Sequence, residues 1–300
     1  MNRSLSLAAV FLLAVVALAV TSVGAQPAAK PVTPKAAPAS PPEAPAAADP
    51  MERMTWTGIL SEDEFKALHS LRSEAAPALN GEMIALAGGQ AYLSLPEGAG
   101  PHPGIVVIQE WWGLNDNIKH WSDRLAADGY AALAVDLYDG KIATTNDEAF
   151  SYMKAVEDDR AHEILRAGFD FLKQDSRVRA PTLGCVGWCF GGGWSLNAAL
   201  AWPDINAAVI YYGRLVDDPE RLGKIGAKIC GIFGNQDQGI PPEAVDAFQA
   251  GLDRAGVRYE IHRYDANHAF ANPSSGRYDE KAAGDAWTKV RAFFAANLRS

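Results

Sequence analysis

Residues 183–195 constrain the fold of this chain more than any other segment. They begin as an apolar run, turn through several glycines and continue into residues 194–200, whose composition is typical of a helix. This succession of strand, turn and helix contains the Gly-x-Nuc-x-Gly pattern of a nucleophile elbow, with Cys189 at the nucleophile position. The turn of such an elbow is crowded, so we expect that a side chain at Gly187 or Gly191 would collide with neighbouring backbone.

Cys189 has two interpretations. In an elbow, its sulfur lies beside a helix N-terminus, where the partial positive charge favours a thiolate. Alternatively, Cys189 is a small buried hydrophobic residue, as free cysteines often are. The sequence favours the nucleophile, because an acid and a histidine follow later in the chain in the order that this chemistry uses.

Composition narrows the class of protein. With 300 residues, of which 48% are hydrophobic, the chain can bury one large core and form one main domain. Its net charge of −9 and its lack of basic clusters argue against a nucleic-acid partner. Its three cysteines do not form a disulfide framework, and no His-x-x-x-His or Cys-x-x-Cys spacing indicates a metal site.

The first 50 residues are typical of an exported protein. Residues 1–25 combine a positively charged start, a long apolar run and small residues at the end, which predicts a cleaved signal peptide. An uncleaved membrane anchor is the alternative, because the apolar run is not far short of a spanning helix. Residues 26–50 are rich in Ala and Pro and predict a disordered linker. We therefore expect a periplasmic or secreted protein that is not stably inserted in the membrane once the signal is removed.

A folded region is expected from residue 51 onward. Residues 51–80 predict a short helical extension, since Ser61 and Glu64 have the spacing of a capping box. Residues 81–300 then alternate between strands and helices. The expected strands are 82–86, 90–95, 104–108, 131–135, 183–187, 207–212, 228–233 and 258–264, and the expected helices are 115–128, 147–157, 160–172, 242–255 and 280–298. This alternation predicts an α/β fold with a mostly parallel central sheet and helices on both faces.

Three residues suited to catalysis each follow a predicted strand. They are Cys189, Asp237 and His268, and the carboxyl ends of parallel strands are where such sheets bind ligands. Nucleophile, acid and histidine occur in the order of the α/β-hydrolase triad, in which the histidine moves protons and the acid orients the imidazole. Two alternatives remain for the acid. Asp237 could serve only the turn in which it lies, and Asp265 is nearer to the histidine in sequence.

The strand order usual for this fold also predicts the state of the other two cysteines. It separates the strands of Cys185 and Cys230 by the strand at 207–212. Two steps between strands of about 4.8 Å place them about 9–10 Å apart, which is too far for a disulfide. We expect both to stay reduced and buried, with Cys189 as the one reachable thiol.

Six short motifs together resemble the dienelactone hydrolase family. They are the segments 109–113, 136–138, 187–195, 211–214, 239–242 and 268–273, and the resemblance runs from roughly residue 80 to the C-terminus. It implies the α/β-hydrolase fold and the triad of Cys189, Asp237 and His268.

The resemblance also implies roles around the triad. Glu110 matches a glutamate that contacts the resting cysteine and takes its proton when substrate binds. The alternative is that Glu110 only positions the loop that carries Trp111 and Trp112. The backbone N–H groups of Phe190 and Trp111 match the oxyanion hole.

The chain departs from the family pattern at the substrate clamp, where the founding enzyme binds the carboxylate of its lactone with arginines. Asn272 and Asn146 stand at the matching positions, so a strong preference for a dicarboxylate-like dienelactone is not expected. Arg214 or Lys141 could substitute for them. The aromatic residues that follow the strands favour an apolar pocket. The expected substrate-binding residues are Trp112, Tyr138, Arg214, Phe270 and Asn272.

The sequence thus predicts an exported hydrolase that opens an ester or a lactone through a thioester on Cys189. Water then attacks this acyl-enzyme with the help of His268, and no cofactor is needed. A thioesterase or peptidase would use the same residues on a different acyl bond. A non-catalytic binding protein with this fold is the alternative from another class. The expected partner is a small-molecule substrate, whose identity the sequence does not specify, and the oligomeric state stays open.

Overall fold

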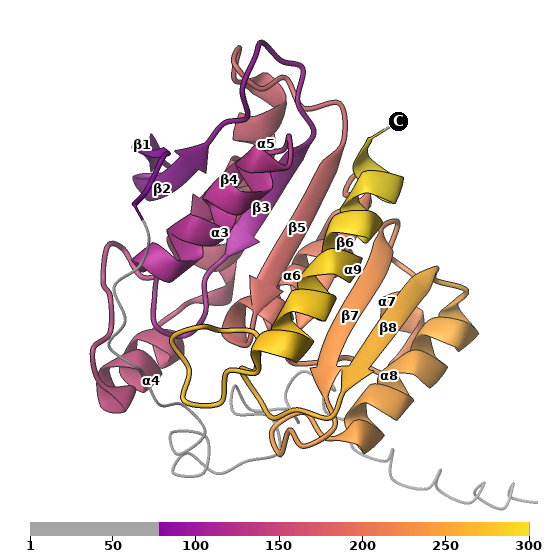
Figure 1. Cartoon of the computed structure of the whole chain (residues 1–300). Helices are drawn as coiled ribbons and strands as arrows, with labels where there is room; N and C mark the ends of the chain where they lie inside the picture. The colour runs from indigo at the N-terminus through magenta and orange to yellow at the C-terminus, as the bar shows by residue number, and fades with distance from the viewer. Residues whose placement is uncertain (1–77, 300) are drawn as a thin grey trace, which may run out of the picture. The chain divides into compact units, whose positions relative to one another are not determined.

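A computed structural model describes residues 78–299, so the expected signal peptide, the linker and most of the helical extension lie outside the described residues. The described chain forms an eight-stranded sheet in the order β1-β2-β4-β3-β5-β6-β7-β8 (Figure 1). Its strands are β1 (Glu82–Leu86), β2 (Gly89–Ser94), β3 (Gly104–Ile108), β4 (Ala131–Val135), β5 (Leu183–Trp188), β6 (Ala207–Tyr211), β7 (Lys228–Gly234) and β8 (Tyr259–Tyr264). β2 pairs antiparallel with β1 and β4, and all other neighbouring strands are parallel.

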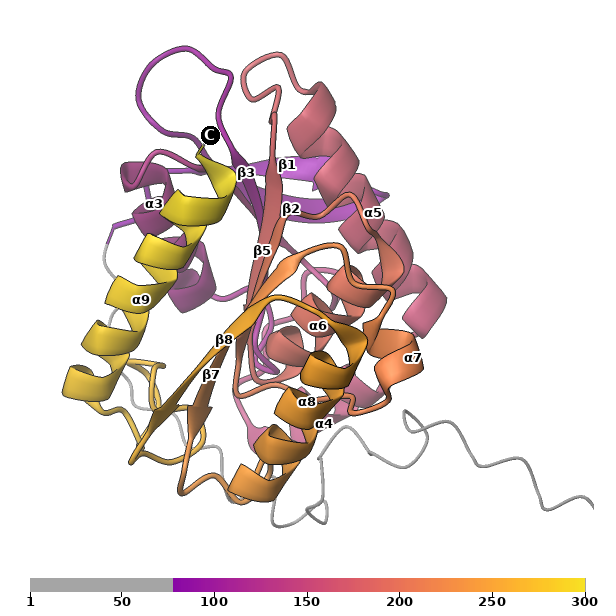
Figure 2. The same cartoon turned by 90° about the vertical axis from the view of Figure 1, so that its right-hand side faces the viewer.

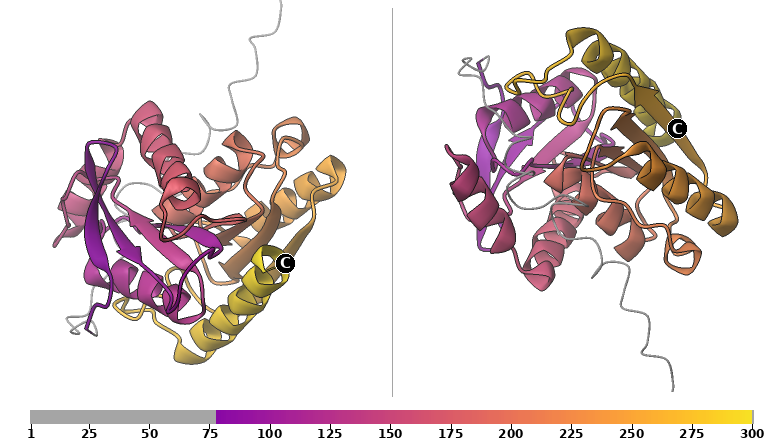
Figure 3. Two further views of the ribbon diagram at one scale, coloured as in Figure 1. Left: turned by 90° about the horizontal axis from the view of Figure 1, so that it is seen from above. Right: turned by 90° about the horizontal axis from the view of Figure 1, so that it is seen from below.

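Helices cover both faces of this sheet. They are α3 (Asp116–Ala127), α4 (Asn146–Lys154), α5 (Asp158–Gln174), α6 (Phe190–Ala201), α7 (Pro219–Leu222), α8 (Pro242–Ala255) and α9 (Glu280–Leu298). Figure 2 shows α3 and α9 on one face and α5, α6 and α8 on the other, and Figure 3 shows the same division along the strands. The predicted α/β architecture is confirmed.

The predicted elements are found with small shifts in their ends. The helix expected at 147–157 ends at Lys154, and α5 begins at Asp158 rather than at residue 160. The acidic first turn of α5 explains the earlier start, because carboxylates stabilise a helix N-terminus. The short α7 was not expected, since four residues are too few to show a hydrophobic period.

Burial of the central strands fixes where the chemistry can lie. Every residue of β3, β4, β5 and β6 is buried, as expected of parallel strands covered on both faces. Charged side chains are therefore absent from these four strands and lie in the loops that follow them. The loops after β3, β5, β7 and β8 leave the same edge of the sheet, which is the lower edge in Figure 1.

The strand order also decides the state of the cysteines. β6 lies between β5, which carries Cys185, and β7, which carries Cys230, as predicted. Both cysteines are free and fully buried. Cys189 is also buried, with 5% of its surface exposed, so it is much less reachable than expected.

In the part of the chain that the structure describes, no helix has the length and apolar character to span a membrane.

A single residue, Cys189, joins the end of β5 to the start of α6. Its backbone has φ 54° and ψ −115°, a conformation that is strained for a residue with a side chain. The Cys189 N–H donates to the carbonyl oxygen of Tyr211 over 3.0 Å, and its own carbonyl accepts from the N–H of Gly193 over 3.2 Å. These two backbone hydrogen bonds tie the turn to the neighbouring strand and to the helix.

The elbow glycines are required by close approach of the backbone, as predicted. A Cβ at Gly187 would lie 2.0 Å from the carbonyl oxygen of Gly191. A Cβ at Gly191 would lie 2.3 Å from the carbonyl oxygen of Ile108, which ends β3. The elbow is therefore pressed directly against the end of the neighbouring strand.

Gly187→Ala should lower the free energy of unfolding by at least about 2 kcal/mol, because the contacting atoms are backbone and cannot move aside. Gly284→Ala is the matched control. Gly284 lies in α9 with open space around it, so alanine there should stabilise the protein by about 0.5–1 kcal/mol. Denaturant unfolding of both variants checks the prediction, and equal stability of Gly187→Ala and the wild type would contradict it.

Candidate active site

Asp237 and His268 form a buried pair at the carboxyl edge of the sheet. Asp237 lies in the loop after β7, and His268 lies in the loop after β8. The His268 Nδ1 and Asp237 Oδ2 atoms are 2.6 Å apart, and both side chains are almost completely buried. The other carboxylate oxygen of Asp237 accepts hydrogen bonds from the N–H groups of Gly239 (2.8 Å) and Ile240 (3.0 Å). Asp237 is therefore held by its own loop with one oxygen toward the imidazole.

Asp265, the rival acid, faces elsewhere. Its carboxylate is exposed and accepts a hydrogen bond of 2.8 Å from the side chain of Gln236. The structure thus pairs the histidine with Asp237, although Asp265 is nearer in sequence. The segment 239–242 does more than form the turn, because the N–H groups of Gly239 and Ile240 hold the Asp237 carboxylate in place.

Cys189 contacts the other side of the imidazole. Burial raises the pKa of the Cys189 thiol, while hydrogen bonds with His268 and with the backbone of Phe190 act in the opposite direction. Loss of water is the largest of these influences, so the net direction is opposite to the one expected from the helix N-terminus. Burial alone would lower the pKa of His268, but Asp237 and Cys189 raise it well above its usual value.

Glu110 is a buried carboxylate in the loop after β3. Burial raises its pKa to about 7, against the lowering influence of His268 and of a hydrogen bond from Asn272. The Asn272 Nδ2 donates to Glu110 Oε2, and the Asn272 Oδ1 accepts from the backbone N–H (2.8 Å) and the hydroxyl (2.6 Å) of Ser274. The structure thus brings Glu110 into the site with a neutral partner.

Asn272 does not have the position expected of a residue that contacts substrate. Both polar atoms of its amide are bound within the protein, to Glu110 and to Ser274, and the side chain is buried. Asn272 instead orients the Glu110 carboxylate. Ser274 could not be identified from the sequence, because a serine in a loop is too common to stand out.

The two groups expected to form the oxyanion hole belong to the elbow and to the loop after β3. The Phe190 N–H hydrogen-bonds with the Cys189 sulfur, which places this donor beside the sulfur. Trp111 is fully buried in the turn closed by the hydrogen bond from Gly113 N–H to the Glu110 carbonyl (3.2 Å). Since the backbone at the start of this loop is in close contact with Gly191, the structure brings the loop and the elbow together.

Aromatic rings pack around these residues. The Tyr138 ring centroid lies 5.7 Å from that of Phe190, and the centroids of Trp111 and Trp112 are 5.0 Å apart. The Tyr138 hydroxyl is buried without a hydrogen-bond partner in the described chain. Its pKa is raised well above its usual value, mainly by burial and to a smaller extent by the nearby Cys189. An unpaired buried hydroxyl near Cys189 is suited to bind a polar atom of a substrate.

Tyr212 is a site residue that the sequence analysis did not single out. Its ring centroid lies 5.1 Å from that of His268 and 5.7 Å from that of Phe270. Its backbone has φ 35°, and its buried hydroxyl has no hydrogen-bond partner among residues 78–299. The one available signal was its place in the segment 211–214 at the end of a strand. Arg214, two residues on, is half-buried beside the first turn of α6.

A buried Cys–His–Asp arrangement, with the cysteine on a strained elbow at the carboxyl edge of a mostly parallel sheet, defines the α/β-hydrolase class. Comparisons with known proteins agree. The model of the dienelactone hydrolase family matches residues 90–298. The chain belongs to the dienelactone hydrolase family, as the sequence motifs predicted, and is an ester or lactone hydrolase.

Relatives support this assignment. A protein from Methylorubrum extorquens named "Putative carboxymethylenebutenolidase" is 32% identical over 219 residues, which cover 68% of this chain and 75% of that protein. "Protein usf" from Aquifex pyrophilus is 33% identical over 214 residues, which cover 68% and 92%. A crystal structure described as a "Putative Dienelactone Hydrolase" from Klebsiella pneumoniae is 28% identical, has a TM-score of 0.63 and covers 73% of this chain and 99% of that one.

The raised pKa of Glu110 predicts a pH-dependent stability effect. A carboxyl group whose folded-state pKa rises from 4.5 to about 7 destabilises the fold increasingly between these values, because burial disfavours the ionised form. Glu110→Gln removes this cost. As the pH rises from 5 to 8, the free energy of unfolding of the variant should therefore increase relative to that of the wild type by on the order of 2–3 kcal/mol. Urea unfolding at both pH values measures the gain.

Glu97→Gln is the control, since Glu97 is a carboxylate in an exposed loop. This variant removes a carboxylate that is exposed rather than buried. Its difference in free energy of unfolding from the wild type should therefore stay nearly constant between the two pH values. An equally constant difference for Glu110→Gln would contradict the prediction.

Proposed function

We propose that this protein is an exported esterase or lactonase that forms a thioester on Cys189. The observation that carries the mechanism is the buried Asp237–His268 pair, whose Nδ1 and Oδ2 atoms are 2.6 Å apart, next to a cysteine on a strained elbow. The proposal of export rests on the sequence pattern of residues 1–25.

The resting thiol must first lose its proton. When a substrate carbonyl enters the site, the Cys189 proton passes to Glu110, whose pKa of about 7 lets it accept a proton near neutral pH and release it again. The thiolate then attacks the carbonyl carbon. Negative charge develops on the carbonyl oxygen, where the N–H groups of Phe190 and Trp111 stabilise it.

Collapse of this intermediate breaks the bond between the carbonyl carbon and the alkoxy oxygen. The leaving oxygen takes a proton from His268, whose imidazolium form is stabilised by Asp237. In a lactone, this oxygen stays attached to the acyl group, so the ring opens. His268 then removes a proton from water, and the hydroxide attacks the thioester carbonyl. Collapse breaks the carbon–sulfur bond, releases the acid and leaves the Cys189 thiolate, which takes back the proton held by Glu110.

The charge around the site favours a neutral substrate. Asn272 is bound to Glu110 and Ser274, so no cation stands at that clamp position. Asn146 is the first residue of α4 and is likewise uncharged. Tyr138, Trp112 and Phe270 contribute aromatic surface. We therefore propose that the substrate is a neutral ester or lactone rather than a dicarboxylate-like dienelactone.

Cys189→Ala, His268→Ala and Asp237→Asn should each reduce kcat/KM for an aryl ester by at least about a thousandfold, because each removes a part of one catalytic unit. Asp265→Asn is the matched control and should leave kcat/KM nearly unchanged, since that carboxylate faces Gln236. Steady-state assays on folded, purified variants decide between the two acids. Near wild-type activity of Cys189→Ala would remove the nucleophile from the mechanism.

A matched pair of substrates tests the preference for neutral esters. We expect kcat/KM for a neutral aryl ester or lactone to exceed that for an anionic dienelactone of similar size by about tenfold or more, because burying an unpaired carboxylate is costly. A preference for the anion would contradict this. If Arg214→Gln then abolished that preference, Arg214 would be the cation that binds the carboxylate.

A further inference from the structure

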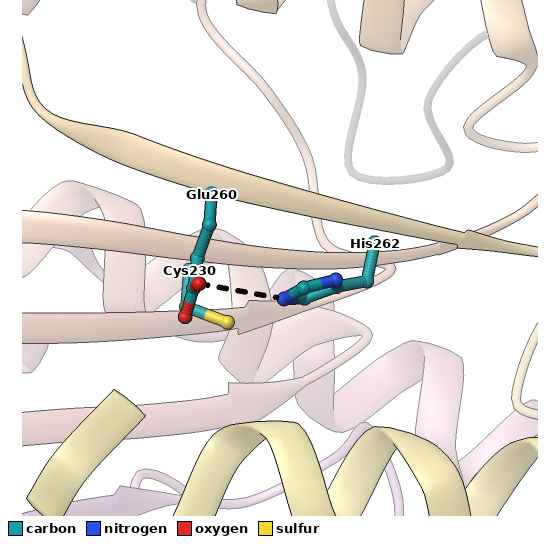
Figure 4. Close-up of side chains that lie close together, drawn as sticks. All are labelled: Cys230, Glu260 and His262. Carbon is teal, nitrogen blue, oxygen red and sulfur yellow. Dashed lines mark ion pairs between the residues drawn. The ribbon is translucent and has the colours of Figure 1, made fainter. Parts of the chain in front are cut away.

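A second group of chemically reactive side chains lies away from the triad, on β7 and β8. Cys230 is paired with Glu260 in the parallel ladder, and Ile232 is paired with His262. Because side chains alternate between the faces of a strand, Glu260 and His262 lie on the same face of β8. Figure 4 shows the side chains of Cys230, Glu260 and His262 converging on one point of the sheet.

The ligand atoms of these residues are close enough to share one ion. The cysteine sulfur, a carboxylate oxygen and an imidazole nitrogen all lie within 4.8 Å of one another. The His262 Nε2 is 3.7 Å from Glu260 Oε2, and the Cys230 thiol hydrogen-bonds with Glu260. The His262 Nε2 atom is buried and has no hydrogen-bond partner within residues 78–299. A buried nitrogen aimed at a thiol and a carboxylate is an unused ligand position.

We propose that Cys230, Glu260 and His262 bind one zinc ion, with water as the fourth ligand. Sulfur, nitrogen and oxygen donors together suit Zn²⁺ and Co²⁺, whereas Mg²⁺ and Ca²⁺ prefer oxygen alone. In a tetrahedral zinc site the ligand atoms are about 3.5 Å apart, as bond lengths of about 2.0–2.3 Å require. The atoms here need to approach by up to about 1 Å, which rotation of the partly exposed His262 and Glu260 side chains can supply. On binding, the Cys230 thiol releases its proton to solvent.

The site is reachable from solvent. A groove with a volume of about 460 Å³ runs between β8 and α9 and is lined by Glu260, His262 and Lys289, among others. The groove is also lined by the cations Lys228, Arg258 and Lys289. Lys289 acts electrostatically on both Cys230 and His262, and its ammonium group is 2.7 Å from the carboxylate of Asp285. This ion pair offsets the repulsion that the lysine would exert on a cation.

The position of the cluster predicts what the ion would do. Within residues 78–299, β8 is an edge strand that pairs only with β7, and β7 and β8 lead into the loops of Asp237 and His268. An ion bound to both strands would fasten this edge of the sheet. Cys230 and Glu260 lie near the opposite ends of their strands from the triad, so the ion would stabilise the fold without touching the reacting atoms.

The experiment uses the full chain with Cys189→Ala, which removes the thiol that could bind zinc at the triad. Calorimetric titration with Zn²⁺ should give one equivalent of binding, and thermal unfolding should show a higher Tm with Zn²⁺ than with Mg²⁺. Adding His262→Gln or Glu260→Gln should weaken Zn²⁺ binding by at least about tenfold. Loss of a residue that only hydrogen-bonds to a metal ligand already has an effect of this size, and loss of a ligand should have at least as large an effect. His102→Asn, in a distant exposed loop, is the control and should bind as tightly as its parent.

A spectroscopic readout separates ligation from a merely structural effect. Co²⁺ bound to the Cys189→Ala protein should show a thiolate-to-cobalt charge-transfer band, and Cys230→Ser should lose it. Because Cys230 is fully buried and its replacement could unfold the chain, the half-exposed His262 and Glu260 variants provide an independent test. Absence of stoichiometric binding, or binding unaffected by His262→Gln and Glu260→Gln, would overturn the proposal. Neither result depends on the reaction proposed for Cys189.

Discussion

The strained backbone of Cys189 is the constraint on which the rest of the site depends. A positive φ at this residue turns the chain directly from β5 into α6 and leaves the sulfur at the edge of the sheet. The turn persists because Gly187 leaves room for the backbone of Gly191, and Gly191 lets the elbow approach the end of β3. That approach also sets the distance from Cys189 to the loop after β3, which carries Glu110.

Burial then determines how the charged groups behave. Asp237 receives two backbone N–H groups and the imidazole, so its charge is well supported. Glu110 has only the neutral amide of Asn272 and the nearby His268, and its pKa rises to about 7. One carboxylate can thus stabilise the imidazolium while the other exchanges a proton near neutral pH, and their different surroundings set this division.

The sequence was sufficient for the sheet, the elbow and the pairing of Asp237 with His268, because apolar runs, glycines and the order of the polar loops can be read along the chain. It could not resolve what depends on two segments meeting in space. Three features depend on such meetings. They are the hydrogen bond between Asn272 and Glu110, the packing of the Tyr212 ring against His268, and the burial of Cys189. The cluster at Cys230 was missed for the same reason, since its ligands come from paired strands rather than from a short spacing.

The pairing of Glu110 with an uncharged amide has a consequence for engineering the enzyme. Because burial raises the pKa of Glu110 to about 7, its ionised form costs stability in mildly alkaline solution, so we expect a neutral side chain there to give a more stable protein. Directed evolution for heat tolerance above neutral pH would therefore enrich substitutions at this position, and under the mechanism proposed above the selected variants would be inactive. The same selection in mildly acidic solution would leave the residue alone, because the protonated side chain carries no such penalty.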